Sequence, residues 1–192
     1  MKVIADITMS LDGYVTGPGD DIGRLHDWVF GGAATGTDPR SSTTGIDAQI
    51  LTDSFETRGA VVMGRRTYDI TNGWNGEPPF QVPCFVLTST PRESYVTENG
   101  TTFDFVVDGA AAAIDRARAA AGALDVSVMG GAQTITRALD AGLVDELQIH
   151  LVPRIVGGGI HLFDSIGREI ELERYRVEES RWATHLFFRV VR

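Results

Sequence analysis

The sequence predicts an α/β fold with a mixed, mostly parallel central sheet and an antiparallel hairpin at its C-terminal end. Between residues 46 and 153, short apolar runs alternate with segments of helical spacing, a pattern typical of parallel strands joined by right-handed crossovers. Two further runs, near 170–179 and 183–191, follow each other without a helix and can pair as a hairpin. The length suits one domain, so we expect residues 1–192 to form a single one.

The expected elements follow in chain order. Residues 2–9 form a first strand, and residues 10–43 form a long loop, because they are rich in Gly, Asp, Ser and Thr with little period. Asp108 is expected to cap a helix over 109–121, which Gly122 ends. The other helices are expected at 46–57, after Gly64 and at 132–141, and the other strands at 60–64, 84–89, 103–107, 126–129 and 146–153.

Composition and charge narrow the class of protein. The chain has 43% hydrophobic and 22% charged residues, which is ordinary for a soluble globular protein. A formal net charge of −9 argues against nucleic acid or an anionic membrane as the main partner. Lys2 is the only lysine, so a catalytic lysine is nearly excluded. The N-terminus lacks the apolar region of a signal peptide and no apolar run approaches about 18 residues, so we expect a cytoplasmic protein.

The cysteine and the histidines give no sign of a reactive or metal-binding cluster. Cys84 stands alone within an apolar run and is expected to be a buried small apolar residue. His26, His150, His161 and His185 lack metal-ligand spacing, so we expect no metal and interpret each as a surface or hydrogen-bonded core residue.

Three stretches place ligand-binding chemistry where a strand ends, which is where open α/β sheets bind ligands. In "VVMGRRTYD" (61–69), Gly64 ends a strand and Arg65, Arg66 and Thr67 open a helix. Helix amides and forked guanidinium donors suit a phosphate. The alternative is a solvated arginine pair with Thr67 as a helix cap.

The other two stretches carry small polar residues and glycines. In "VLTSTPR" (86–92), Thr88, Ser89 and Thr90 can bond a ribose or its phosphate, or form a polar turn before proline. In "MGGAQTI" (129–135), two glycines stand between strand and helix. They indicate either a tight turn or a close backbone approach to phosphates, and the stretch does not match the G-x-G-x-x-G fingerprint.

Four motifs in order resemble one known family. They are "ITMSLDGYV" (7–15), "GAVVMGRRTYD" (59–69), "VMGGAQTI" (128–135) and "LVDELQIHLVPRIVGGGIHLF" (143–163). The chain resembles the dihydrofolate reductase superfamily, and more closely the reductase domain of riboflavin biosynthesis and its small stand-alone relatives. The resemblance implies a dihydrofolate reductase-like three-layer fold, NADPH as cofactor, hydride transfer to a small-molecule substrate, and a homodimer.

The resemblance also implies a set of cofactor contacts and a cis peptide bond between the two glycines of the loop. "SLDG" (10–13) would turn the chain beside the nicotinamide, although an Asp-Gly pair is also a plain turn signal. The implied cofactor contacts are Gly13, Val15, Gly64, Arg65, Arg66, Thr67, Leu87, Thr88, Ser89, Thr90, Met129, Gly130, Gly131, Ala132, Gln133 and Thr134.

Three carboxylates are candidates for the acid that a C=N reductase benefits from. Asp47 lies on the helix before the "MGR" strand, as the acid of dihydrofolate reductases does, although Thr44-x-x-Asp47 also fits a capping pattern. Asp6 stands where riboflavin-type reductases commonly carry a lysine, and this departure puts a phosphoribosylamino-pyrimidine substrate in doubt. Asp12, in the "SLDG" turn, is the third candidate, and Asp53 is a weaker one.

Three functions follow from these patterns. The leading hypothesis is an NADPH-dependent reductase of the riboflavin-biosynthesis type. The runner-up has dihydrofolate or another pterin as substrate. A non-catalytic NADPH-binding sensor is the alternative of another class, and turnover on a panel of ring substrates separates it from the first two.

Overall fold

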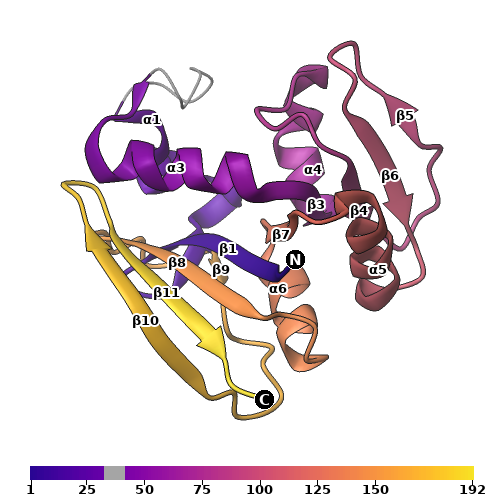
Figure 1. The fold of residues 1–192 in the computed structure, drawn as a ribbon. Coiled ribbons are helices and arrows are strands. Elements are labelled where there is room, and N and C mark those ends of the chain that lie inside the picture. The colour runs from indigo at the N-terminus through magenta and orange to yellow at the C-terminus, as the bar shows by residue number, and fades with distance from the viewer. Residues whose placement is uncertain (33–41) are drawn as a thin grey trace.

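The computed structural model describes residues 1–32 and 42–192. In this part of the chain the main sheet has the strand order β10-β11-β8-β1-β7-β3-β4-β6-β5, shown in Figure 1. The strands are β1 (Val3–Ser10), β3 (Arg58–Gly64), β4 (Cys84–Leu87), β5 (Tyr95–Val96), β6 (Thr102–Val106), β7 (Asp125–Met129), β8 (Glu146–Val152), β10 (Leu172–Glu179) and β11 (Thr184–Val190). Strands β8, β1, β7, β3, β4 and β6 run parallel, and β11, β10 and β5 are antiparallel to their neighbours.

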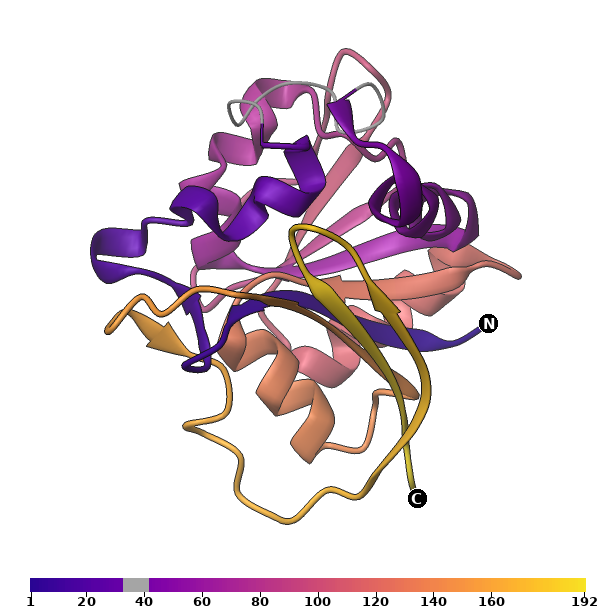
Figure 2. The same cartoon turned by 90° about the vertical axis from the view of Figure 1, so that its left-hand side faces the viewer.

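Helices cover both faces of this sheet. The chain passes from β1 to β3 and on to β4 in one direction along the sheet, and returns from β6 to β7 and β8 in the other. Because such crossovers are right-handed, the outward and the return helices lie on opposite faces, as Figures 1 and 2 show. The outward helices are α3 (Gly45–Thr57) and α4 (Arg65–Ile70), and the return helices are α5 (Ala110–Ala121) and α6 (Ala132–Asp140).

The two faces of the central strands differ in polarity. Strand side chains alternate between the faces, so Val3 and Ala5 of β1 point toward α5 and α6 with Leu147 and Ile149 of β8 and with the buried residues of those helices. On the opposite face, beneath α3, the same strands present polar side chains. These are Asp6 and Thr8 of β1, Ser127 of β7, Gln148 and His150 of β8 and His185 of β11.

The structure confirms most of the expected elements, including the C-terminal hairpin. The segment 10–43 is not a plain loop, since its described part contains short elements. These are β2 (Tyr14–Thr16), η1 (Pro18–Asp20), η2 (Gly23–His26) and α1 (Asp27–Phe30), and β2 pairs with β9 (Ile160–His161). A further 3-10 turn, η3 (Asn72–Gly76), follows α4. Within the described residues, no helix has both the length and the apolar character that crossing a membrane demands.

The expected cap of α5 by Asp108 is wrong, and the capping alternative for Thr44 and Asp47 holds only for the position of Thr44. Gly109 is the N-cap of α5, and Asp108 instead pairs with Arg116 on the exposed side of that helix at 2.9 Å. Thr44 occupies the N-cap position of α3 but makes no side-chain capping bond, and Asp47 bonds to a distant residue rather than to the helix start. In both cases another side chain, Arg116 of the same helix for Asp108 and His185 of β11 for Asp47, takes the carboxylate in place of the capping bond that the sequence pattern suggests.

Candidate functional site

The three stretches singled out in the sequence meet at one edge of the sheet. Strand β3 lies between β7 and β4, so Gly64 and Met129 end neighbouring strands and Gly64 pairs with Leu87. Because these strands are parallel, their carboxyl ends open on the same side. The structure therefore brings together Gly64–Thr67, Leu87–Thr90 and Met129–Thr134, as predicted.

The glycine loop packs closely against both neighbouring helix starts. A methyl group added at Gly130 would lie 2.5 Å from Cγ2 of Thr67, and one added at Gly64 would lie 2.6 Å from Oγ1 of Thr134. The hydroxyls of Thr67 and Thr134 both approach Gly131. Within the described residues, neither hydroxyl has a hydrogen-bond partner. Two hydroxyls without partners beside a glycine loop are groups that can bind a ligand's phosphate oxygens.

The predicted cis bond between Gly130 and Gly131 is wrong, because the structure has this peptide bond in trans. Gly130 and Gly131 instead reach the required turn through positive φ values of 70° and 83°. Glycine adopts this left-handed region without the steric penalty that a Cβ brings. The loop thus needs glycine for its backbone angles and for its contact with Thr67.

Both arginines that open α4 are paired with carboxylates. Arg65 donates from Nε to Asp69 one turn later, at 2.7 Å. Arg66 donates from Nε to Asp20 of η1 at 2.8 Å, and its terminal nitrogen contacts the same oxygen. Arg66 is 61% exposed, so water weakens this pair. Gly64 is the N-cap of α4, so Thr67 is not its capping residue.

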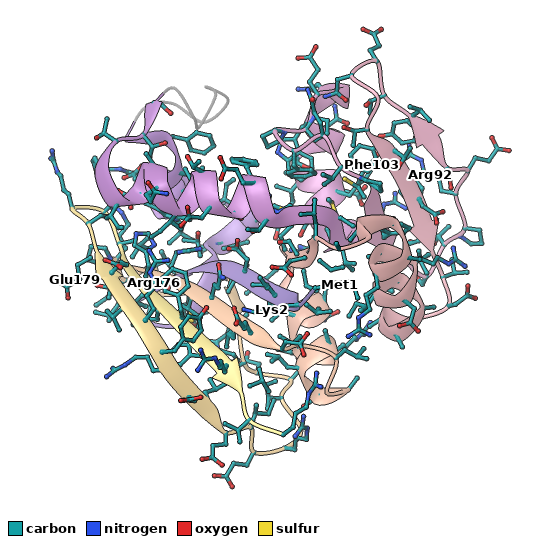
Figure 3. The ribbon with its side chains drawn as sticks, in the orientation of Figure 1. Met1, Lys2, Arg92, Phe103, Arg176 and Glu179 are labelled. Atoms are coloured by element: carbon teal, nitrogen blue, oxygen red, sulfur yellow. The ribbon has the colours of Figure 1, made fainter. Side chains whose placement is uncertain are left out.

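The remaining predicted cofactor contacts are arranged around this edge. Thr88 accepts from the amide of Thr90 at 3.1 Å, which closes a small turn, and Ser89 and Thr90 are exposed. Gln133 is exposed on the first turn of α6, whereas Ala132 is buried. Arg92 follows this turn and lies over the Phe105 ring, 4.9 Å from its centroid, on the same side of the molecule as Phe103 (Figure 3).

Asp12 is half-buried, and its carboxylate is occupied by hydrogen bonds that hold the chain in place. Its carboxylate accepts from Ser10 Oγ at 2.7 Å and from the amides of Val156 and Gly157. It therefore fastens the "SLDG" turn to the segment after β8. Gly13 packs against His161, and Val15 is buried.

The other two acidic candidates, Asp6 and Asp47, are joined through two histidines. His150 Nε2 lies 3.1 Å from Oδ1 of Asp6, and His150 Nδ1 lies 2.7 Å from Nδ1 of His185. His185 Nε2 lies 2.8 Å from Oδ1 of Asp47. The Trp28 ring lies against His150 with centroids 4.1 Å apart and a tilt of 36°, and the indole N–H of Trp28 donates to Thr8 Oγ1. This set of four residues, Asp6, His150, His185 and Asp47, is called the Asp–His–His–Asp chain below.

Asp47 cannot touch a substrate in this conformation, because its side chain is 5% exposed and bonded to His185. Asp6 is different. Its Oδ2 faces Arg58 at 3.7 Å, and its side chain is 20% exposed in a cavity of about 110 Å³ beneath α3. Arg58 Nε and Ser127 Oγ, which line the same cavity, are buried and lack partners within the described residues. Asp6 also pairs along the sheet with Met129, next to the glycine loop.

Sequence reasoning missed the role of the two histidines. It correctly put Leu147 and Ile149 on one face of β8. The alternation of side chains along β8 could have indicated this role, because it puts Gln148 and His150 on the opposite face of the strand, the face that Asp6 shares. The spacing of β11 puts His185 directly across from His150.

Comparison with known proteins gives a family and a set of relatives. A model of the RibD C-terminal domain family matches residues 1–185. The Bacillus subtilis protein YwjB is 27% identical over 188 residues, covering 97% of each chain. YyaP of the same organism is 24% identical over 179 residues, covering 90% of this chain and 85% of YyaP. Both relatives are described as uncharacterized.

Solved structures share the fold. A Shewanella sp. PV-4 protein described as belonging to riboflavin biosynthesis matches over the full length of both chains, with a TM-score of 0.75 and 24% identity. A pyrimidine reductase-like protein from Corynebacterium diphtheriae matches with a TM-score of 0.65 and 15% identity, over 100% of this chain and 92% of its own. The Thermotoga maritima diaminohydroxyphosphoribosylaminopyrimidine deaminase/5-amino-6-(5-phosphoribosylamino)uracil reductase matches with a TM-score of 0.67 and 15% identity, over 99% of this chain and 56% of its own. The fold is thus of the dihydrofolate reductase type.

Proposed function

Because the chain belongs to the RibD C-terminal domain family, we propose that it is a reductase that uses NADPH to reduce a small ring or imine-like substrate. The observation that carries this proposal is the meeting of three strand ends at one edge of the sheet. That edge offers a glycine loop, two arginines and two threonine hydroxyls that have no partner in the part of the chain that the structure describes, and together these suit a dinucleotide's phosphates.

Different residues at this edge are proposed to contact different parts of the cofactor. Gly130 and Gly131 allow phosphates to approach the backbone, with Thr67 and Thr134 as hydroxyl ligands. On cofactor binding, the Arg66 guanidinium would release its hydrogen bond to Asp20 and donate to a phosphate oxygen instead. Thr88, Ser89 and Thr90 and the side chain of Gln133 reach the outer part of the cofactor. When bound, NADPH supplies the hydride, and the protein orients the two reactants and excludes water.

The substrate is proposed to be a nitrogen-containing ring compound of the class reduced by pyrimidine reductases, as in the names of two structural relatives. Asp6 replaces the lysine that riboflavin-type reductases commonly carry at this place. An anionic side chain there favours a substrate that presents N–H donors rather than an anionic group. By the same family likeness we propose that the protein is cytoplasmic and forms a homodimer. Light scattering on the purified chain tests the dimer.

Titration of the protein with NADPH, followed by nicotinamide fluorescence, tests the cofactor site. The double variant Arg65→Ala, Arg66→Ala is expected to weaken binding at least tenfold, because two phosphate-facing cations are lost. The matched control is Arg174→Ala, Arg189→Ala, which removes the same charge from the exposed hairpin β10–β11. An equal loss in both double variants would show a general charge effect and refute the site.

Loss of NADPH absorbance in the presence of pyrimidine, pterin and folate compounds then tests the activity. Turnover on a pyrimidine supports the proposal, and turnover only on a pterin or folate identifies a different substrate class. Tight NADPH binding without turnover on any compound would favour a non-catalytic sensor.

A further inference from the structure

We propose that the Asp–His–His–Asp chain is a proton reservoir that holds one excess proton, and that Asp6 passes this proton to the substrate. The excess proton is a property of the protein without ligands. Its delivery to a substrate rests on the reductase function proposed above.

The proton count follows from the hydrogen bonds. Three contacts link the four residues, at 3.1, 2.7 and 2.8 Å, and each needs one hydrogen between its two atoms. Two neutral imidazoles bring only two ring hydrogens. If only two hydrogens were present, one of the three contacts would have no hydrogen. Its two acceptor atoms would then repel each other at hydrogen-bond distance. The chain therefore holds three protons, which makes its net charge −1 rather than −2.

The central contact fits a charged bond. A separation of 2.7 Å between His150 Nδ1 and His185 Nδ1 is at the short end of the ~2.7–3.2 Å range of hydrogen bonds and within the ~2.7–2.9 Å range of charge-assisted ones. One histidine is then an imidazolium that donates from Nδ1 to the other. The Trp28 ring lies at 36° to His150 and meets His185 edge-on with centroids 5.1 Å apart, and an aromatic ring this close to a cation stabilises it.

The surrounding charges place the excess proton near Asp6. Burial is the largest influence on His185 and lowers its pKa, against the opposing hydrogen bond with Asp47, which favours the neutral form of this ring. Burial alone raises the pKa of Asp6, but the hydrogen bond and charge of His150, together with Arg58, outweigh it and leave that pKa lowered. Arg58 brings the set to zero net charge. His26 of η2 also acts on His150, but burial lowers its own pKa to about 4, so it stays neutral near pH 7.

The reservoir has its opening at Asp6. The side chains of His150, His185 and Asp47 are 1%, 0% and 5% exposed, whereas Asp6 is 20% exposed. One carboxylate oxygen of Asp6 bonds His150, and the other faces the cavity with Arg58. A proton can therefore enter or leave this buried set through Asp6, which is also its member nearest the glycine loop.

The proton step balances with the proposed reduction. When a C=N bond is reduced, its carbon takes the hydride and its π electrons move to nitrogen, which takes a proton. His150 gives its Nε2 proton to Asp6 Oδ1, and Asp6 gives a proton from its carboxyl group to that nitrogen. The chain then holds two protons and a net charge of −2. His150 and Asp6 are left facing each other as two acceptors, so the next proton from water in the cavity binds there.

Nitrogen-15 NMR of the histidine rings in the ligand-free protein tests the proton count. Single variants His150→Gln and His185→Gln assign the two rings, and His161→Gln is the control that leaves both ring spectra unchanged. At pH 7 we expect His150 as an imidazolium and His185 as a neutral ring. Two neutral rings at pH 7 would overturn the reservoir, whatever the protein's function.

Kinetics test the delivery of the proton to the substrate that the NADPH absorbance assay identifies. In His150→Gln, and in Asp47→Asn should the first variant fold poorly, we expect the rate of the chemical step to fall at least tenfold with unchanged NADPH affinity. The loss should grow as pH rises, because bulk acid can replace the reservoir only at low pH. A pH-independent loss, or no loss, would overturn proton delivery while leaving the reductase function standing. Absence of NADPH binding would instead refute the proposed function and with it the delivery.

Discussion

The contact between Gly130 and Thr67 gives the sharpest stability prediction. Replacing Gly130 with alanine adds a methyl group 2.5 Å from Thr67 Cγ2, at a residue whose φ is +70°. The left-handed backbone costs a non-glycine residue about 1–2 kcal/mol. Forcing a methyl group into a filled space costs a further ~1–3 kcal/mol. We therefore expect Gly130→Ala to lower the free energy of unfolding by about 2–5 kcal/mol.

A matched glycine separates the two contributions. Gly142 has a φ of +66°, and a Cβ added there has no atom within 4 Å. Gly142→Ala should therefore lose only the backbone part, about 1–2 kcal/mol. The double variant Gly130→Ala, Thr67→Ala removes the two closest atoms of the contact. The free energy of unfolding that the double variant loses relative to Thr67→Ala alone should therefore equal the loss in Gly142→Ala.

Urea unfolding of the four variants and the unmodified chain measures these differences, provided that the denaturant slope stays constant. For a chain of this size, about 1 kcal/mol corresponds to roughly 2–4 °C in Tm, so thermal melts give an independent check. The reasoning is refuted if Gly130→Ala costs no more than Gly142→Ala. It is also refuted if removing Thr67 brings no relief, since the close contact would then carry none of the cost.

Three further outcomes follow from the charges and burial of single residues. Asp20→Asn should raise NADPH affinity by about 1.4-fold to fivefold in a fluorescence titration, because Arg66 is released from an exposed ion pair worth ~0.2–1 kcal/mol. Asp104→Asn, at another exposed ion pair, should leave the affinity unchanged. His26 has a folded pKa of about 4 against an ordinary 6.5, so the unfolded chain binds the proton first. Stability should therefore fall as pH drops from 6.5 toward 4, and His26→Gln should flatten urea midpoints over that window; an equally steep fall in the variant would contradict the assignment. Burial raises the pKa of Cys84 to about 12, so a disulfide reagent should label the folded chain at pH 8 on the order of a thousandfold more slowly than the urea-unfolded chain, and equal rates would disprove its burial.

Local pattern was enough to predict that the three strand ends meet at one edge of the sheet. Gly64 and Met129 end parallel strands, and parallel strands joined by helices open their carboxyl ends together. Neither conclusion needs knowledge of a distant partner. The cis bond failed because it came from resemblance, whereas positive φ at both glycines already makes the turn.

The Asp–His–His–Asp chain was beyond local pattern. Its three contacts join residues 144, 35 and 138 positions apart, from four different elements. Alternation along β8 gives the face on which His150 lies, but the partner on that face depends on strand order. Asp47 shows the limit most clearly, because a local capping pattern and a distant histidine compete for one carboxylate. The buried histidine wins, since an uncompensated polar group there costs more than an unmade cap at an exposed helix end.

A buried polar set of this kind is a poor source of stability, which is the strongest reason to assign it chemistry. Asp47 and the protonated histidine pair together carry zero net charge, so replacing Asp47, His150 and His185 with leucine removes no net charge and leaves Asp6 with Arg58. By analogy with other buried ion pairs, the triple variant should be as stable as the unmodified chain or up to about 1–4 kcal/mol more stable. Asp47→Leu alone leaves the buried Nε2–H of His185 without its acceptor and removes the carboxylate that balances the excess proton, so it should cost about 3–5 kcal/mol. Urea unfolding distinguishes these outcomes. If both histidines were neutral, Asp47→Leu alone would lower the free energy of unfolding only slightly. That outcome would refute the excess proton.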